Sequence, residues 1–240
     1  MNNYPTIRIS DSKFRELLDR FDPDRADNNS PPWLDPPVVD GTPLFPEENN
    51  KEALGFFLLL GALNYSYWLW DGNTVSTWGG NVNGERVEDV FALCFSIQRA
   101  RERKNLRFDA NTYRNMDRST VKEIFSFGGT CEIPMLSTRL RKIRELGKGL
   151  HRFAEVTGEE PCFANLLKSY RTFPAVLDAM ERFFPYAFGD PFRKLSQLCL
   201  KMIMDRTADP DSSRDPLFPT DREWRDATGF LSEEYLRAQP

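Results

Sequence analysis

The sequence is poor in the residues that most often bind metal ions. Its 240 residues include one histidine, His151, and four cysteines, Cys94, Cys131, Cys162 and Cys199. A site with two or three histidine ligands is therefore impossible, and the wide spacing of the cysteines excludes a Cys-x-x-Cys zinc or redox motif. A Ser-His-Asp or Cys-His catalytic machine would have to use His151, which we interpret as a surface or partly packed residue. We expect neither a metal ion nor a cofactor.

Several targeting and binding signals are also missing. No Gly-rich loop follows a strand and opens a helix, which excludes the P-loop and dinucleotide types of phosphate site. The N-terminus lacks the apolar segment of a signal peptide, so we expect a cytoplasmic protein with reduced cysteines. The net charge of −4 disfavours a protein that coats a nucleic-acid polymer, and residues 205–240 alone carry that whole charge.

One apolar run is long enough to be either a membrane-spanning helix or a buried core helix. Residues 53–70, ALGFFLLLGALNYSYWLW, carry no formal charge and approach the length of a membrane span. Asn64 and Ser66 dilute the second half, and Lys51 alone gives no convincing positive-inside signal. The run therefore predicts a central helix that is buried in a protein core.

Helical patterns dominate the remainder and predict a mainly α protein. We expect a single helical domain over 51–240, preceded by an extended N-terminal arm, 1–50, with one short helix. We expect the prolines between residues 22 and 50 to prevent helix formation and strand pairing in that arm. Gly-Gly and Asn-Gly steps predict a small β-hairpin near 73–87. Amphipathic helices are expected at 88–101, from 117 or 120 to about 128, at 137–153, as a pair within 161–184, at 190–206 and from about 221.

An aromatic cluster at the end of the apolar run is a candidate binding wall. Tyr65, Tyr67, Trp68 and Trp70 lie beside Asn64. Aromatic rings stack on flat heterocycles, and an amide such as that of Asn64 reads the edge of such a ring. The alternative is ordinary core packing with satisfied polar tips.

Two groups of cations are candidate phosphate ligands. Lys194 and Gln197 lie one helical turn apart, so both reach a single pocket in which Lys194 could hold a phosphate. The alternative is that both side chains are solvated on the protein surface and bind no ligand. The helix 137–153 carries its cations off the apolar stripe, which suits either a phosphate pocket or a solvated helix face. These cations are Arg139, Arg141, Lys142, Arg144, Lys148 and Arg152.

The order of several segments resembles the queuosine salvage family, the queuosine 5′-phosphate N-glycosidases. The matching segments are LNYSYW at 63–68, EDVFALCFSIQRA at 88–100, EIPMLSTRLRKIRELGKGL at 132–150 and the helix pair at 163–190. The resemblance covers roughly residues 50–230. It implies an architecture similar to helical DNA glycosylases. It also implies cleavage of the N-glycosidic bond of queuosine 5′-monophosphate, which releases queuine for salvage into tRNA modification.

The resemblance also suggests site residues. The family has a Lys-Arg-Ala-Gln segment followed by a Phe-Ala-Asp segment that carries the catalytic aspartate. Here 194–197, KLSQ, keeps the Lys and Gln, and 224–226, WRD, falls at the matching distance. This implies that Asp226 is catalytic. We then expect Asp226 to lie across a cavity from Trp68 and near Lys194. The implied substrate-binding residues are Asn64, Tyr67, Trp68, Glu88, Phe91, Lys194, Gln197 and Trp224.

A rival register leads to a different expectation. Aligning Thr228-Gly229-Phe230 with the family's Thr-x-Phe puts Ser232 at the catalytic position, which would suggest an inactive protein. The family continues well beyond the point matching Pro240, so the resemblance implies a C-terminally shortened member.

Three functions follow from these observations. The first is metal-independent hydrolysis of queuosine 5′-monophosphate, and the second is the same reaction on another (deaza)purine nucleotide. The third is a catalytically inactive protein that binds a nucleotide or a partner. We expect a small-molecule nucleotide as partner, with neither a nucleic-acid polymer nor a membrane, and the oligomeric state is left open.

Overall fold

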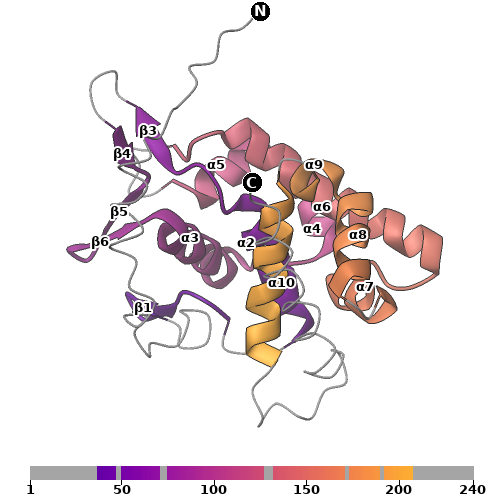
Figure 1. The fold of residues 1–240 in the computed structure, drawn as a ribbon. Helices are drawn as coiled ribbons and strands as arrows, with labels where there is room; N and C mark the ends of the chain where they lie inside the picture. The colour runs from indigo at the N-terminus through magenta and orange to yellow at the C-terminus, as the bar shows by residue number, and fades with distance from the viewer. Residues whose placement is uncertain are drawn as a thin grey trace, which may run out of the picture. The chain divides into compact units, whose positions relative to one another are not determined.

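The computed structural model is mainly α-helical, with small antiparallel strand pairs, as the sequence predicts (Figure 1). It describes residues 37–46, 50–70, 75–126, 132–170, 173–189 and 192–207, all within one compact unit, Pro32–Pro240. The helices besides the central one are α3 (Asp89–Lys104), α4 (Ala110–Asn115), α5 (Arg118–Ile124), α6 (Leu136–Thr157), α7 (Phe163–Tyr170), α8 (Phe173–Phe183), α9 (Pro185–Phe188) and α10 (Arg193–Thr207).

The apolar run forms a buried helix, but a shorter one than predicted. Helix α2 spans Lys51–Leu63, and every residue from Ala53 to Leu63 is buried. The Asn50 side chain caps its start by accepting a hydrogen bond from the Ala53 amide at 2.9 Å. The expected continuation to Trp70 is wrong, because the chain leaves the helix at Asn64. Within the described residues, no helix is long and apolar enough to cross a membrane.

The second half of the run belongs to a strand pair instead. Strand β3 (Trp68–Trp70) pairs antiparallel with β4 (Val75–Thr77), and β5 (Gly79–Val82) pairs with β6 (Glu85–Glu88). The β5–β6 hairpin overlaps the range predicted near 73–87 and ends one residue beyond it, at Glu88. Its two turn residues, Asn83 and Gly84, have φ values of 50° and 90°, as a two-residue hairpin of the primed type requires.

The described part of the predicted arm also differs from expectation. Strand β1 (Val38–Val39) pairs with β2 (Thr42–Pro43), so prolines nearby do not prevent strand pairing here. A two-residue ladder needs few backbone donors, and Asp40 and Gly41 supply the positive φ values of a tight turn. Leu44 and Phe45 then enter the hydrophobic core, where the Phe45 ring lies 6.3 Å from that of Phe56.

Helices α2 and α6 each have one closely packed neighbouring helix. Helix α10 lies beside α2, and Gly61 allows the approach because a Cβ there would overlap Cys199 (Figure 1). Helix α4, which the sequence analysis did not predict, packs against α6 at Gly147.

Helix α5 begins after Asp117, whose carboxylate accepts from the Thr120 amide at 2.7 Å. This contact selects Asp117 over Thr120 as the N-cap.

Replacement of Gly147 by alanine is expected to lower the free energy of unfolding by about 2 to 3 kcal/mol. The added Cβ would overlap the backbone nitrogen of Arg114 and the carbonyl oxygen of Ala110, and backbone atoms of a packed helix do not move aside easily. Urea denaturation followed by circular dichroism measures the change. The control is Lys148→Ala, the next residue on the same helix, which is exposed and should leave stability nearly unchanged. Equal stability of the two variants would contradict the close α4–α6 packing.

Candidate functional site

A buried arginine of α6 holds the segment that follows α2. Arg139 is fully buried. It donates to the backbone carbonyls of Leu63 and Tyr65, to that of Ser66 at 3.0 Å and to that of Pro134 at 2.9 Å. Burial lowers the pKa of its guanidinium from the ordinary 12.5. Since carbonyls at the C-terminal end of a helix lack partners within it, Arg139 satisfies them and fixes the turn into β3.

A buried lysine lies one turn further along α6. Lys142 is fully buried and donates to the carbonyl of Ala187 at 3.0 Å. Its ammonium lies 3.4 Å from the ring centroid of Phe192 and 4.5 Å from that of Tyr65. Burial, followed by the nearby Arg139 charge, lowers the pKa of Lys142 to about 8. The hydroxyl of Tyr65 is buried and has no hydrogen-bond partner among the described residues.

The expectation that Arg139 and Lys142 lie off the buried face of the helix is therefore wrong. Both occupy the face that also buries Ile143, Leu146 and Phe153. A signal was present in the spacing, because positions 139, 142, 146 and 153 recur at helical intervals and line up on one side. Only the aromatic rings and carbonyl oxygens supplied by distant segments make two cations acceptable there.

Four aromatic residues and one asparagine follow α2, and we call this group the aromatic corner. It consists of Asn64, Tyr65, Tyr67, Trp68 and Trp78. The Tyr67 hydroxyl donates to Asn64 Oδ1 at 3.0 Å, and its ring stacks on Trp78 at 6.3 Å with an interplanar angle of 16°. Burial raises the pKa of Tyr67 above its usual range. Trp78 is fully buried, whereas Trp68 is 69% exposed. The corner therefore has a packed base and one exposed ring.

Backbone pairing brings the start of α3 to this corner. Trp78 donates its amide to the Tyr67 carbonyl at 2.7 Å and accepts from the Asp89 amide at 3.1 Å. Gly79 pairs with Glu88 in the β5–β6 ladder. The Glu88 carboxylate accepts from Arg86 Nε at 2.6 Å. Burial and the neighbouring Glu88 raise the pKa of Asp89.

The structure brings some of the predicted site residues together. Asn64, Tyr67 and Trp68 share one segment. Glu88 is linked to this segment only through the backbone, because Trp78 bonds both to Tyr67 and to Asp89, the residue after Glu88. Phe91, in the first turn of α3, is 37% exposed. Helix α10 begins beside the corner, where the rings of Phe192 and Tyr65 lie 5.6 Å apart.

Other predicted residues cannot be placed. Gln197 is half-buried on α10, and Lys194 lies on the same helix with a side chain outside the described part. Trp224, Asp226 and Ser232 lie outside the described residues, as does the side chain of Trp70. The expected position of Asp226 across a cavity from Trp68 therefore stays a prediction.

The single histidine behaves as predicted. Half-buried His151 is within hydrogen-bond distance of Asn111 Oδ1, with its Nε2 at 3.0 Å, which makes it a partly packed surface residue. In the part of the chain that the structure describes, no three His, Cys, Asp or Glu side chains gather as metal ligands would.

Comparison with known proteins assigns this chain to a family. The sequence profile of the family described as queuosine salvage protein matches residues 44–172, more than half of the chain. The chain belongs to the queuosine salvage protein family. A relative from Nematostella vectensis, named queuosine 5′-phosphate N-glycosylase/hydrolase, is 32% identical over 104 residues. That alignment covers 43% of this chain and 29% of the relative's length.

Lys142 is expected to make stability depend on alkaline pH. Its pKa is about 8 in the folded protein, below the ordinary 10.5, so between these values the unfolded chain binds more protons than the folded protein. Stability then rises with pH across this window, because the penalty for burying the charge is fully present below about pH 8 and absent above about 10.5. Urea unfolding of the native protein and of Lys142→Met across the window measures the effect. The native protein should gain stability relative to the variant, and a pH-independent difference would contradict this account.

Proposed function

We propose that this protein is an N-glycosidase that hydrolyses queuosine 5′-monophosphate and releases queuine. The observation that carries the proposal is the family match over residues 44–172, which includes the aromatic corner, α3 and α6. The name of the Nematostella vectensis relative, queuosine 5′-phosphate N-glycosylase/hydrolase, supports the same activity. In this proposal residues 51–240 are the helical glycosidase-like domain and 1–50 its N-terminal arm, and the protein acts in the cytoplasm.

The aromatic corner suits the base of such a nucleotide. Trp68 offers an exposed ring on which a flat deazapurine can stack, while Asn64 and Tyr67, on the same segment, form a hydrogen-bonded pair. The Asn64 amide still has donor capacity for the edge of the base, because its Oδ1 accepts from Tyr67. Glu88 and Phe91 extend this surface towards α3, and Trp224 is proposed as a further aromatic contact.

The proposed chemistry follows from the charge of the transition state. Cleavage of an N-glycosidic bond passes through a cation shared by the ribose C1′ and ring oxygen. A carboxylate beneath the ribose stabilises that cation and activates the water that adds to C1′, and we assign this role to Asp226. Lys194 and Gln197 are proposed to hold the 5′-phosphate, which positions C1′ over the carboxylate. No step requires a metal ion.

Incubation of the purified full chain with queuosine 5′-monophosphate tests the proposal. Mass spectrometry should detect queuine together with ribose 5-phosphate, at a rate that a metal chelator does not change. A parallel panel of purine and 7-deazapurine nucleoside monophosphates should give slower release of their bases. If another nucleotide of the panel were cleaved and queuosine 5′-monophosphate were not, that nucleotide would be the substrate. Loss of the activity in the presence of chelator would contradict metal independence. If no nucleotide were cleaved, the protein would instead be a catalytically inactive protein that binds a nucleotide or a partner.

A further inference from the structure

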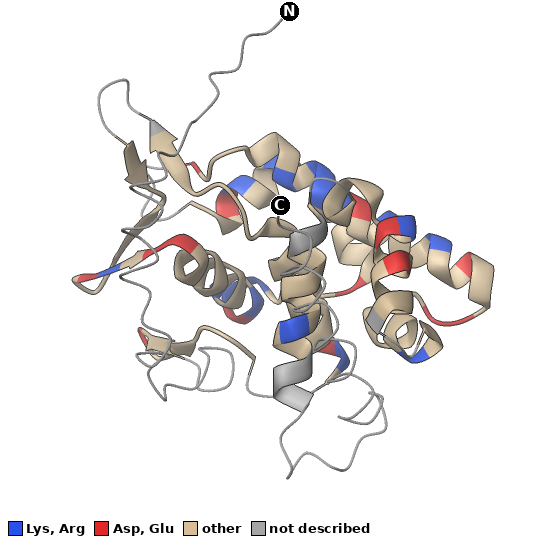
Figure 2. Ribbon diagram, in the orientation of Figure 1, with Lys and Arg blue, Asp and Glu red and all other residues tan. Residues whose placement is uncertain are grey.

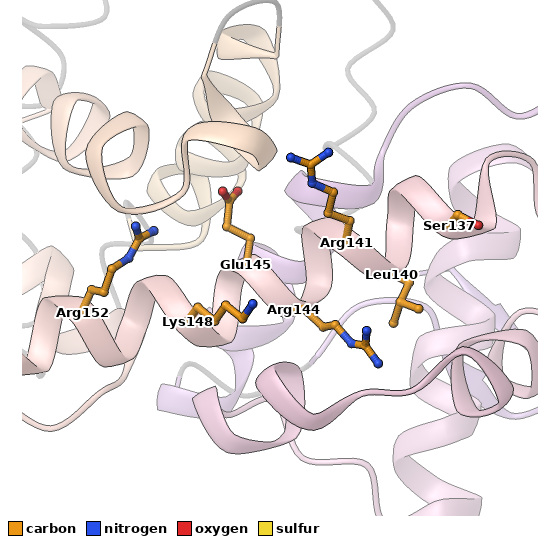
Figure 3. Close-up of a pocket in the computed structure, with 7 residues that line it drawn as sticks. All are labelled: Ser137, Leu140, Arg141, Arg144, Glu145, Lys148 and Arg152. Carbon is orange, nitrogen blue, oxygen red and sulfur yellow. The ribbon is translucent and has the colours of Figure 1, made fainter.

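The solvent-facing side of α6 carries a basic groove on the face opposite Arg139 and Lys142. The groove has a volume of about 450 Å³. In Figure 3, Arg141, Glu145 and Arg152 leave the helix on one side, Arg144 and Leu140 on the other, and Lys148 lies between them. The lining residues are Ser137, Leu140, Arg141, Arg144, Glu145, Lys148 and Arg152.

Neighbouring helices hold the walls of this groove. Arg144 donates from Nε to the carbonyl of Met116 at 2.7 Å, on the side of α4 and α5. On the other side Arg152 donates to the carbonyl of Phe183, and the Arg141 guanidinium lies 3.8 Å from the ring centroid of Tyr186. Three of the four cations are therefore oriented before any ligand arrives, which lowers the entropy cost of binding.

The groove stays positive overall, because its one lining carboxylate, Glu145, offsets only one of the four positive charges of Arg141, Arg144, Lys148 and Arg152. The two oxygens of Glu145 accept from the backbone amides of Tyr186 and Ala187 at 3.0 and 2.7 Å, so this carboxylate is engaged at the start of α9. Among the described residues, no carboxylate lies within ion-pair distance of Arg141, Arg144, Lys148 or Arg152. Some cations elsewhere do have such partners, as in Lys51–Glu160 and Lys104–Glu123. Figure 2 shows basic segments recurring along α6.

The spacing of the cations points to more than one phosphate. Arg141, Arg144, Lys148 and Arg152 follow one another about once per turn, so they span roughly 16 Å along the helix at about 1.5 Å per residue. A row of anionic groups matches such a row of cations better than a single anion does. The volume of about 450 Å³ lies in the range of small-molecule sites, and the net charge of −4 opposes a long polyanion.

We propose that this groove binds a small anion with two or more consecutive phosphate groups, such as inorganic triphosphate or the tail of a nucleoside triphosphate. The site is separate from the aromatic corner, because its cations lie on the opposite face of α6 from Arg139 and Lys142, which support that corner. It goes beyond the proposed glycosidase function, whose substrate carries a single phosphate.

Calorimetric titration of the full chain with inorganic triphosphate tests the proposal. Triphosphate should bind more tightly than orthophosphate, and its affinity should fall as salt is added. The double variant Arg141→Gln/Lys148→Gln should weaken binding by about 10-fold or more, since each lost cation removes a charge-assisted contact. The control Arg103→Gln/Arg107→Gln removes the same charge from exposed positions on and after α3 and should bind like the native protein.

Three results would overturn the proposal. The first is equal binding of triphosphate by native protein and by an Arg141→Gln/Lys148→Gln variant that unfolds at the native urea concentration. The second is equal weakening in both double variants, which would indicate only a general effect of net charge. The third is a single-stranded RNA oligomer that binds through these residues while triphosphate does not, which would make the groove a polymer site.

Discussion

Replacing Asp226 by asparagine is expected to slow queuine release by about 10³-fold or more. The substitution keeps the size of the side chain but removes the negative charge that is proposed to stabilise the ribose cation and activate water. Because the loss falls on the transition state, kcat should drop far more than KM rises. Mass-spectrometric time courses of queuine release from queuosine 5′-monophosphate measure both constants.

Asp221→Asn is the matched control for this experiment. It removes one carboxylate from the same acidic segment without touching a residue to which a role is assigned, so it should retain native activity. Full activity of Asp226→Asn would show that another group performs the chemistry. An inactive native protein would instead favour the register in which Ser232 occupies the catalytic position.

Replacing Arg139 by methionine should lower the free energy of unfolding by about 3 kcal/mol or more. The guanidinium is fully buried and donates to the carbonyls of Leu63, Tyr65, Ser66 and Pro134. Methionine fills part of the space but donates no hydrogen bond, so these carbonyls lose the donor that joins them, although the Leu63 carbonyl still accepts from the Tyr65 amide. Urea denaturation of the variant and the native protein measures the difference.

Arg141→Met provides the comparison, since it lies two residues away on the exposed side of the same helix. Its effect on stability should stay within about 0.5 kcal/mol. If the two variants were equally stable, Arg139 would not be what anchors the segment between α2 and β3. The same experiment separates a structural role of Arg139 from any role in substrate binding, because unfolding is measured without substrate.

Local sequence signals predicted much of the fold. Helices α3 and α6 follow from apolar residues at helical spacing, and the β5–β6 hairpin follows from Asn83-Gly84, whose backbone angles few other residue pairs adopt easily. The end of α2 was missed because residues 64–70 remain aromatic and uncharged, so composition alone does not separate helix from strand there. The backbone contacts of Arg139 and the pairing with β4 decide it, and both come from distant parts of the chain.

The candidate site was only partly accessible to sequence reasoning. Asn64, Tyr67 and Trp68 are neighbours along the chain, so their proximity followed from their order. The buried pair Arg139 and Lys142 was missed, because charged residues are rarely fully buried without a partner carboxylate. Here carbonyl oxygens and the faces of Tyr65 and Phe192 take the place of that carboxylate, and only the packed structure supplies them.

Calorimetric binding of queuosine 5′-monophosphate to the native protein and to Trp68→Ala tests the central claim, that the base stacks at the aromatic corner. Trp68 is 69% exposed, so its removal should leave the fold intact. Val156→Ala, at a residue 62% exposed near the end of α6, is the control. We predict binding about 10-fold weaker for Trp68→Ala, the usual magnitude of one stacking contact, and native affinity for Val156→Ala. Native affinity in Trp68→Ala would contradict the claim.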